Sequence, residues 1–370
     1  MSLRIVLHRE IPEDPELHCQ WNSIAQQTER PEVFYTCEWA LAMQSSYRAS
    51  LKPLLILGYE GDDLVAVASL ATDIAGNKVS FLAGTTGDYC DVLLAHPQQR
   101  AEFVNALFVE IAKMQADKLT LANLPSDSET SAALQDTGRK HGFHVFVRPA
   151  YACARVELGG CAQRKMLKAA ITHKQMLRRK LRGLERAGTV RFSHLRSWSA
   201  IEPALRSFAD THAARFLATG RRSSLATSER RHFLEDLASR FSDSGVVTLS
   251  ILTVNDQPVA WNYGFQFCGS WFWYQPTFDA GWEEHSPGYC LLARIVTEAC
   301  DMDGINVVDL GLGAEGYKER FGNSTRQTLH VAGTRSLRRH LQEIVRYRAA
   351  AVLKKSPKIE SAVRRVLGQR

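Results

Sequence analysis

Residues 271–322 read WFWYQPTFDAGWEEHSPGYCLLARIVTEACDMDGINVVDLGLGAEGYKERFG, and the rest of the chain can be ordered around them. The aromatic run at residues 271–275 predicts a strand, which a turn rich in Gly, Glu and His follows. A helix is predicted to begin at Ser286, a good N-cap residue, with Pro287 at its first position and Gly288 next. Because first-turn amides attract anions, this helix start is a candidate anion-binding site, although a plain helix cap would have the same sequence.

Length and composition favour a soluble globular protein of two domains or one large one. The chain has 370 residues, of which 45% are hydrophobic, enough for a substantial core. Its apolar runs are interrupted well before the roughly 18 residues that a membrane helix needs. The start, MSLRIVLHREIPEDPEL, turns acidic where a signal peptide would stay apolar, so we expect a cytoplasmic protein.

The cysteines and histidines predict neither a zinc site nor a disulfide framework. The eight cysteines include no Cys-x-x-Cys pair, and the histidines form no HExxH motif. We therefore expect reduced cysteines and no metal.

The positive charge is clustered along the chain. The formal net charge is +7, and much of the basic character lies in residues 164–191 and 335–370. This clustering favours a polyanionic partner such as nucleic acid, a phosphorylated cofactor or anionic lipid. A solvated helix face explains such clusters equally well.

The predicted elements occur in the same order in both halves of the chain. The first half is expected to contain a strand (3–9), two helices (16–27, 37–47), a hairpin (52–72), a strand (77–84), a helix (97–116), a strand (118–124), a helix (126–141) and a strand (143–149). A basic helix over residues 163–187 leads to the second half, with a strand (189–195), two helices (199–217, 227–241), a hairpin (246–267) and then the stretch quoted above. Hairpins mixed with helical crossovers imply an α/β fold with a mixed sheet and helices on its faces.

This order of elements resembles the GNAT acyltransferase fold, and its duplication resembles the tandem GNAT arrangement of the Fem-type transferases. The CelD/BcsL group of bacterial acetyltransferases is the most similar. The likeness extends to about residue 335 and is carried by Gly87-Asp88-Tyr89-Cys90-Asp91, Arg178, Arg179, Arg182, Gly188, His212, Arg215, Phe216, Pro258-Val259-Ala260, Phe278-Asp279, Ser286-Pro287-Gly288, Asp309 and Tyr317-Lys318-Glu319-Arg320-Phe321-Gly322. The chain departs from the usual GNAT pattern in one place, because Ser-Pro-Gly replaces the Q/R-x-x-G-x-G/A pyrophosphate loop.

The resemblance implies two tandem GNAT-like domains and a tail. Residues 1–160 would shape the acceptor cleft, residues 161–335 would hold the donor, and residues 336–370 would form a basic amphipathic tail. The donor would be acetyl-CoA or another acyl-CoA, bound by Ser286, Pro287, Gly288 and Tyr289. The acceptor would be an amine, small or glycan-linked, and such enzymes often belong to polysaccharide or cell-envelope loci.

Acyl transfer to an amine needs a base for the ammonium proton and an acid for the departing thiolate. Asp279 is the favoured base, with Glu283, Glu284 and His285 as alternatives in the same turn. An ordinary turn-capping carboxylate is the structural alternative for Asp279.

Three further groups of residues are candidates for the site, each with a structural alternative. Tyr274 and Tyr317 could donate a proton or orient the acyl group, or only fill the core. Lys318 resembles the lysine of the Fem-type YK-x-x-FG run, although a surface lysine would look the same. For the acceptor, the candidates are His212 and Arg215, one helical turn apart, and Asp88, Tyr89 and Asp91, which could equally be packing and turn residues.

Two other functions stay open. A Fem-type aminoacyl-tRNA-dependent transferase would use the basic helix at residues 164–191 for RNA phosphates. A non-enzymatic, nucleotide-sensing module of polysaccharide machinery is the third alternative. The tail, with Leu337, Leu341, Ile344 and Val345 on one helical face among basic residues that include Lys354, Lys355, Arg364 and Arg365, predicts peripheral contact with the inner face of the membrane, or docking on the second domain.

Overall fold

The computed structural model describes residues 3–242, 244–313 and 315–355. The strands are β1 (Arg4–His8), β2 (Leu51–Glu60), β3 (Asp63–Asp73), β4 (Lys78–Phe81), β5 (Leu93–Leu94), β6 (Lys118–Pro125), β7 (His144–Glu157), β8 (Val190–Leu195), β9 (Val247–Val254), β10 (Gln257–Phe267), β11 (Ser270–Phe278), β12 (Val307–Asp309) and β13 (Ser324–Thr334). The α-helices are α1 (Pro15–Gln27), α2 (Cys37–Tyr47), α3 (Arg100–Lys113), α4 (Thr130–Lys140), α5 (Cys161–Thr172), α6 (Gln175–Ala187), α7 (Trp198–Ala218), α8 (Ser228–Arg240), α9 (Pro287–Ala299) and α10 (Leu337–Lys355). Short 3₁₀ turns include η4 (Ala280–His285) and η5 (Lys318–Arg320).

The described strands form one mixed sheet, as the sequence predicts. Their order is β1-β2-β3-β4-β6-β13-β7-β12-β11-β10-β9-β8, with β5 on β3. Most neighbours are antiparallel, while the β4–β6 and β11–β12 pairs, each connected through a helix, are parallel. This is the arrangement expected where hairpins alternate with helical crossovers.

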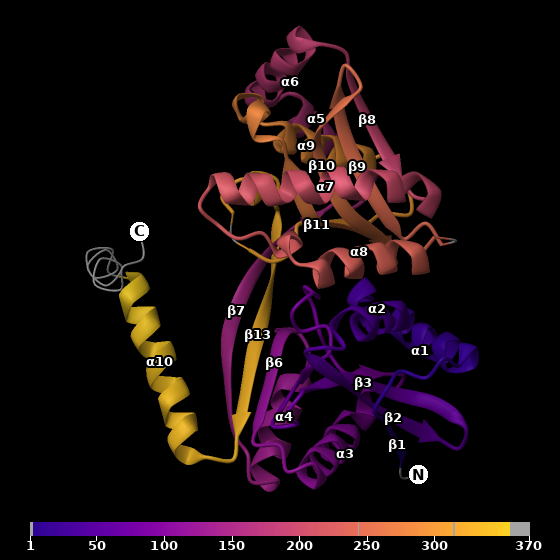
Figure 1. Ribbon diagram of the computed structural model, residues 1–370, viewed down its shortest axis with the longest axis vertical. Coiled ribbons are helices and arrows are strands. Elements are labelled where there is room, and N and C mark those ends of the chain that lie inside the picture. The colour runs from indigo at the N-terminus through magenta and orange to yellow at the C-terminus, as the bar shows by residue number, and fades with distance from the viewer. Residues whose placement is uncertain (1–2, 243, 314, 356–370) are drawn as a thin grey trace.

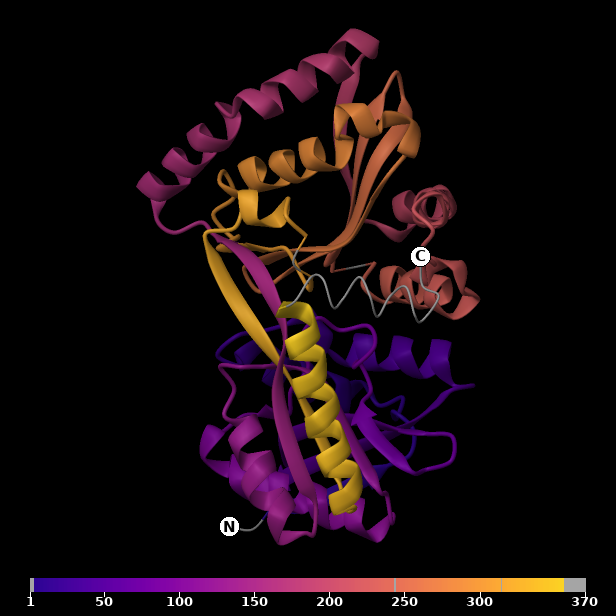
Figure 2. The same ribbon diagram turned by 90° about the vertical axis from the view of Figure 1, so that its left-hand side faces the viewer.

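Two long strands join the halves of the molecule (Figures 1 and 2). β13, the last strand of the second half, lies between β6 and β7 of the first half. The end of β7 continues into the second half, where Val156 pairs with Val308 of β12. The halves therefore share one sheet, and the domain limits given above stay a prediction.

Helices cover both faces of the sheet, and one layer of helices is shared between the halves. α2 packs against α8 across the interface. The ring centroids of Trp39 and Phe233 are 5.2 Å apart, and those of Phe34 and Phe272 are 5.4 Å apart. These side chains belong to one buried cluster that extends from α1 and α2 to α7 and α8. On the outer faces, α3 and α4 cover the first half, and α5, α6 and α9 cover the second.

The basic helix predicted over residues 163–187 is two helices, α5 and α6, with a break at residues 173–174. Lys174 has an extended ψ of 116°, and the hydroxyl of Thr172 donates back to the carbonyl of Lys168 at 2.9 Å. Hydroxyls that bond to the preceding turn compete with the helix, so the break has a local cause. It allows α6 to turn onto the start of α9. No helix among the described residues is long and apolar enough to cross a membrane.

Candidate functional site

The start of α9 has an unusual backbone. Ser286 occupies the N-cap position in the left-handed region, with φ of 50° and ψ of 54°, and its side chain makes no capping hydrogen bond. Pro287 is in the first turn and is buried. Gly288 has space on its Cβ side, where the nearest atom, a ring carbon of Phe278, is 3.4 Å away. The N-cap residue was predicted correctly. Because the hydroxyl of Ser286 does not cap the helix, it is available to a ligand in the space beside α9.

That space is a cavity of about 240 Å³ between α9 and the end of β11. Its walls come from α6, α7, β11, η4, α9 and η5, and it is lined by Met176, Arg215, Trp273, Pro276, Thr277, Phe278, Glu283, Ser286, Gly288, Tyr289, Tyr317 and Arg320. The cavity is therefore bounded by a helix N-terminus and contains two arginines, a combination suited to an anionic ligand.

Arg215 and Tyr317 are the two predicted residues on the walls opposite α9. The guanidinium of Arg215 lies 4.0 Å from the centre of the Phe278 ring, within cation–π distance. Burial raises the pKa of Tyr317 to about 12, so its hydroxyl keeps its proton at neutral pH. The hydroxyl oxygen accepts a hydrogen bond of 3.0 Å from Nε1 of Trp273, which leaves the phenolic proton free to be donated elsewhere.

The four acid–base candidates of the turn before α9 have different positions. Asp279 is exposed, lies outside the cavity lining, and accepts the backbone N–H of Gly281 at 2.9 Å, so it caps η4. Glu283 lines the cavity, whereas Glu284 does not. His285 packs against Gly183 of α6. A Cβ added at Gly183 would lie 2.6 Å from Nδ1 of His285.

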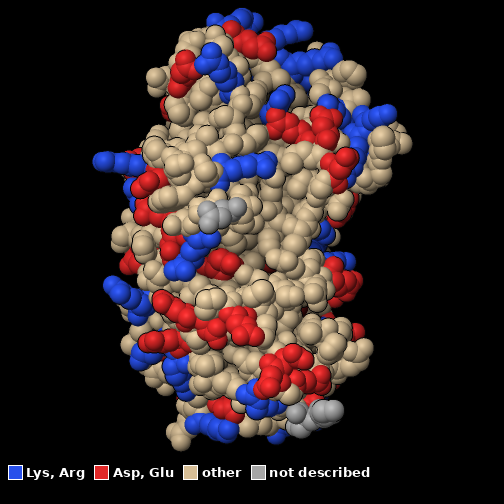
Figure 3. All heavy atoms as spheres, turned by 90° about the vertical axis from the view of Figure 1, so that its right-hand side faces the viewer, with Lys and Arg blue, Asp and Glu red and all other residues tan. Residues whose placement is uncertain are grey.

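α6 lies over this end of the second half and presents a basic surface. Nζ of Lys180 donates to the backbone carbonyl of Glu284, and Met176 reaches the cavity. Arg178, Arg179 and Arg182 are exposed. On the face in Figure 3, several Lys and Arg side chains gather at the end of the molecule where α6 lies, with some Asp and Glu side chains among them.

One family model matches the part of the chain that contains this cavity. Residues 172–319, which contain every residue lining the cavity except Arg320, match the family model described as "Acetyltransferase (GNAT) domain". Residues 172–319 are therefore similar to a GNAT acetyltransferase domain. Within this matched segment, the cavity lies where α9 follows β11.

Solved structures share the fold over most of the chain. FemX aligns with a TM-score of 0.57 and 10% identity over 89% of this chain and 98% of that one. A DUF2156 domain from Agrobacterium fabrum aligns with a TM-score of 0.55 and 13% identity over 91% and 96% of the two chains. L-PGS from Bacillus licheniformis aligns with a TM-score of 0.51 and 12% identity over 83% and 95%. These identities show the fold alone, and no curated protein sequence matches the chain.

Tyr274 and His212 lie behind the cavity beside α9, in a polar network where the two halves meet. Tyr274 donates to the carbonyl of Thr86 at 2.6 Å and accepts from Arg230 at 2.6 Å. Nε2 of His212 is 2.7 Å from Nε2 of Gln275, and its Nδ1 is 2.7 Å from the hydroxyl of Ser223. Burial, helped by nearby arginines, lowers the pKa of His212 to about 4, so this histidine is neutral. The structure therefore places both residues outside the cavity lining.

Lys318, Asp88 and Tyr89 hold the loop that leads from β12 to Tyr317. Nζ of Lys318, which is buried, donates to the carbonyl of Leu312 at 2.7 Å and pairs with Glu315 at 2.9 Å. Asp88, from the first half, accepts the N–H of Leu312 at 3.4 Å, and burial raises its pKa to about 7. Tyr89 is fully buried. These contacts fix the position of the Tyr317 side of the cavity.

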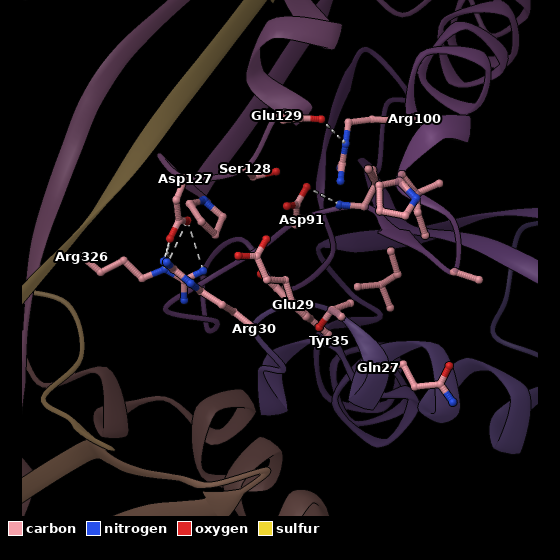
Figure 4. A pocket seen from close by; sticks show the side chains of 17 residues that line it. Gln27, Glu29, Arg30, Tyr35, Asp91, Arg100, Asp127, Ser128, Glu129 and Arg326 are labelled. Atoms are coloured by element: carbon pink, nitrogen blue, oxygen red, sulfur yellow. Dashed lines mark hydrogen bonds and ion pairs between the residues drawn. The ribbon is translucent and has the colours of Figure 1, made fainter. Parts of the chain in front are cut away.

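Asp91 is on the wall of a second cavity, which lies in the first half (Figure 4). This cavity has a volume of about 360 Å³ and is lined by four carboxylates (Glu29, Asp91, Asp127, Glu129) and three arginines (Arg30, Arg100, Arg326), among other residues. Arg30 and Arg326 both pair with Asp127. Asp91 accepts the N–H of Val92 at 2.7 Å, and burial raises its pKa.

Sequence reasoning did not single out Met176, Trp273 or Arg230. The alternation of β11 could have identified Trp273, because Trp271 and Trp273 point to the α9 side while Phe272 points to the opposite core. Nothing in the sequence indicates that Arg230 meets Tyr274. Among the described residues, no group of His, Cys, Asp and Glu side chains is arranged to hold a metal ion.

Proposed function

We propose that the protein transfers an acyl group from acyl-CoA to an amine. The observation that carries the proposal is the single cavity that brings together the first turn of α9, Arg215 and Tyr317. A helix N-terminus with a glycine at its second position can bind the phosphates of a CoA donor through backbone amides. Arg215 and Arg320 add positive charge on the same walls.

The cavity also supplies groups for the chemistry. The acceptor ammonium must lose a proton before the amine nitrogen can attack the thioester carbonyl, and Glu283 is the carboxylate on the cavity wall. Collapse of the tetrahedral intermediate breaks the C–S bond, and the CoA thiolate takes the proton of Tyr317. The attacking nitrogen then gives up its second proton to the Tyr317 phenolate, which leaves the neutral amide, CoA thiol and restored Tyr317. The geometry favours Glu283 over Asp279 as the base, because Asp279 is already occupied in capping η4.

For the acceptor we propose an amine, small or glycan-linked, with the first half shaping its binding site. The first-half cavity supports this assignment by its charge: Asp127 is neutralised by two arginines, whereas Asp91 has no Lys or Arg within 4.0 Å among the described residues. Burial raises the pKa of Asp91, so an ammonium group bound beside it would favour its charged form. An amino sugar or another short cationic amine fits this description.

The test of the donor assignment is calorimetric titration of the protein with acetyl-CoA and longer acyl-CoAs. Gly288→Val would place methyl groups between α9 and Phe278, and we expect donor affinity to fall at least tenfold. Gly304→Val is the matched control, because Gly304 follows the other end of α9 and has open space around it. Equal acyl-CoA affinity for the parent and a folded Gly288→Val protein would refute the proposed donor site.

A second donor class is favoured by the exposed arginines of α6 beside the cavity, namely an aminoacyl-tRNA. Replacing Arg178, Arg179 and Arg182 together by Gln should leave acyl-CoA binding within about twofold if acyl-CoA is the donor. A tRNA-dependent enzyme should instead lose RNA affinity and show a shallower dependence of binding on salt. Loss of transferase activity in a lysate after RNase treatment would decide for tRNA.

A further inference from the structure

α10 carries an apolar stripe that no other described element covers. Leu337, Leu341 and Val345 are 56%, 52% and 64% exposed. Their spacing of four residues places them on one side of the helix. Five other large hydrophobic side chains are similarly exposed in the described part of the chain, and they are scattered over separate elements. Single exposed apolar residues are ordinary, but three in a row on one helix are not.

The opposite side of α10 is fixed to the sheet. Tyr347 packs on Phe146 of β7, with ring centroids 5.7 Å apart, and the Arg148 guanidinium lies over the Tyr347 ring. Glu343 faces Lys118 of β6 at 3.9 Å. Ile344, expected on the exposed stripe, is half-buried. The stripe is therefore held facing outward, away from β7, and the helix runs along the side of the molecule (Figure 2).

The charges around the stripe are positive. Arg338 and Arg348 flank it, both are exposed, and neither has a carboxylate within 4.0 Å among the described residues. The one acidic residue in residues 337–355 is Glu343, on the sheet side. The sequence of residues 356–370 adds four basic residues against one acidic residue.

We propose that α10 docks on an anionic membrane surface, with the leucines and Val345 in the acyl region and the arginines at the headgroups. An apolar stripe bordered by basic side chains is the pattern of helices that lie in the membrane interface. A second copy of the chain is a poorer occupant, because two such stripes in contact would bring their flanking arginines together. Residues 356–370 are disfavoured as a cover for the same reason.

The test is co-sedimentation of the full-length protein with vesicles of phosphatidylcholine, with and without phosphatidylglycerol. Binding should require the anionic lipid and weaken as salt rises. The variant Leu337→Ser/Leu341→Ser/Val345→Ser should bind at least tenfold more weakly, and Arg338→Gln/Arg348→Gln should lose most of the preference for phosphatidylglycerol. The matched control is Ile74→Ser/Met166→Ser/Leu217→Ser, which removes three exposed apolar side chains from other elements and should bind like the parent.

Circular dichroism melting of each variant is the control that checks whether the variant is folded. The proposal is overturned if the parent protein does not bind anionic vesicles, or if the folded α10 triple variant binds them as well as the parent does. Sedimentation that reveals a dimer abolished by the α10 triple variant would assign the stripe to a second copy and likewise overturn the membrane assignment.

Discussion

The hydroxyl of Tyr89 donates a hydrogen bond of 2.9 Å to Oδ2 of Asp309, joining positions 220 residues apart. Both side chains are buried where the first half meets the end of β12. Arg155 lies 3.3 Å from the same oxygen, and the N–H of Gly311 donates to the other oxygen of Asp309 at 2.8 Å. Tyr89 thus ties the first half to the loop that leads toward Tyr317.

Removing that hydroxyl should destabilise the fold. Tyr89→Phe leaves a buried carboxylate short of one donor, and hydrogen bonds to charged groups contribute about 1.5–3 kcal/mol. We expect the free energy of unfolding to fall by about 2 kcal/mol in urea titrations. Tyr151→Phe, at a half-exposed tyrosine, is the control and should change it little. An unchanged stability in Tyr89→Phe would mean that water replaces the lost donor.

Gly311 should tolerate no side chain. Its φ is +69°, and an added Cβ would lie 2.5 Å from Oδ2 of Asp88. Gly311→Ala therefore combines backbone strain with a clash, and we expect a loss of about 1–3 kcal/mol in stability together with slower transfer. Gly316→Ala, in the same loop with no atom near its Cβ position, should be nearly neutral. Equal melting temperatures for the two variants would contradict the contact with Asp88.

Measurements of kcat can show whether Glu283 or Asp279 is the catalytic base. Glu283→Gln removes the proposed base and should lower kcat by about 10² or more, because positioned acid–base groups contribute 10²–10⁴. Glu284→Gln, the neighbour outside the cavity lining, should keep normal turnover. Asp279→Asn should also keep it, since asparagine can still cap η4. A large loss of kcat in Asp279→Asn with a normal Glu283→Gln would return the role to Asp279.

Arg215 should contribute to donor binding through its charge and its planar shape. Arg215→Gln should weaken acyl-CoA binding by roughly tenfold to a hundredfold, in line with about 1.5–3 kcal/mol for hydrogen bonds to charged groups. Arg215→Lys keeps the charge but loses the planar guanidinium, which can donate two hydrogen bonds to one phosphate and stacks on Phe278. Its affinity for acyl-CoA should therefore lie between those of Arg215→Gln and the parent. Titration calorimetry measures both. Full affinity in Arg215→Gln would exclude contact with the donor.

The buried His212 predicts a pH effect on stability. Its pKa of about 4 in the folded protein lies below the ordinary value of about 6.5, so the unfolded chain binds the extra proton first. The contribution of His212 to the free energy of unfolding is therefore fully present above pH 6.5. It is lost as pH falls toward 4, by on the order of 3 kcal/mol. Asp88, whose pKa is raised from 3.8 to about 7 in the folded protein, has the opposite sign: its contribution to stability is fully present below pH 3.8 and is lost as pH rises through 7.

The contribution of His212 can be isolated with His212→Gln. Denaturant titrations at a series of pH values should show a slope between pH 4 and 6.5 that is flatter by about one proton than the slope of the parent. Parallel slopes would mean that His212 titrates alike in both states.

The sequence by itself determined most of the elements and their order, although the one basic helix expected over residues 163–187 is two helices. α2 begins at Cys37 and ends at Tyr47 as predicted, the β9–β10 hairpin turns at Asn255 and Asp256, both with positive φ, and α9 starts after Ser286. These features depend on local chemistry: apolar periodicity, turn residues and caps act within a few positions of the chain. The anion site expected at Ser286 stays a prediction, although Ser286, Gly288 and Tyr289 do line a cavity.

Only the tertiary structure decided which side chains share a site. Tyr274 follows Trp273 in β11, yet the alternation of the strand points Tyr274 at the first half and Trp273 at α9. Lys318 follows Tyr317, but its Nζ is buried in holding Leu312, whereas Tyr317 lines the cavity. β13 lies between β6 and β7 of the first half, and these pairings join residues that are 169 (Ser324 and Arg155) to 216 (Thr334 and Lys118) positions apart. Contacts at such separations depend on how whole elements pack, and no local pattern encodes them.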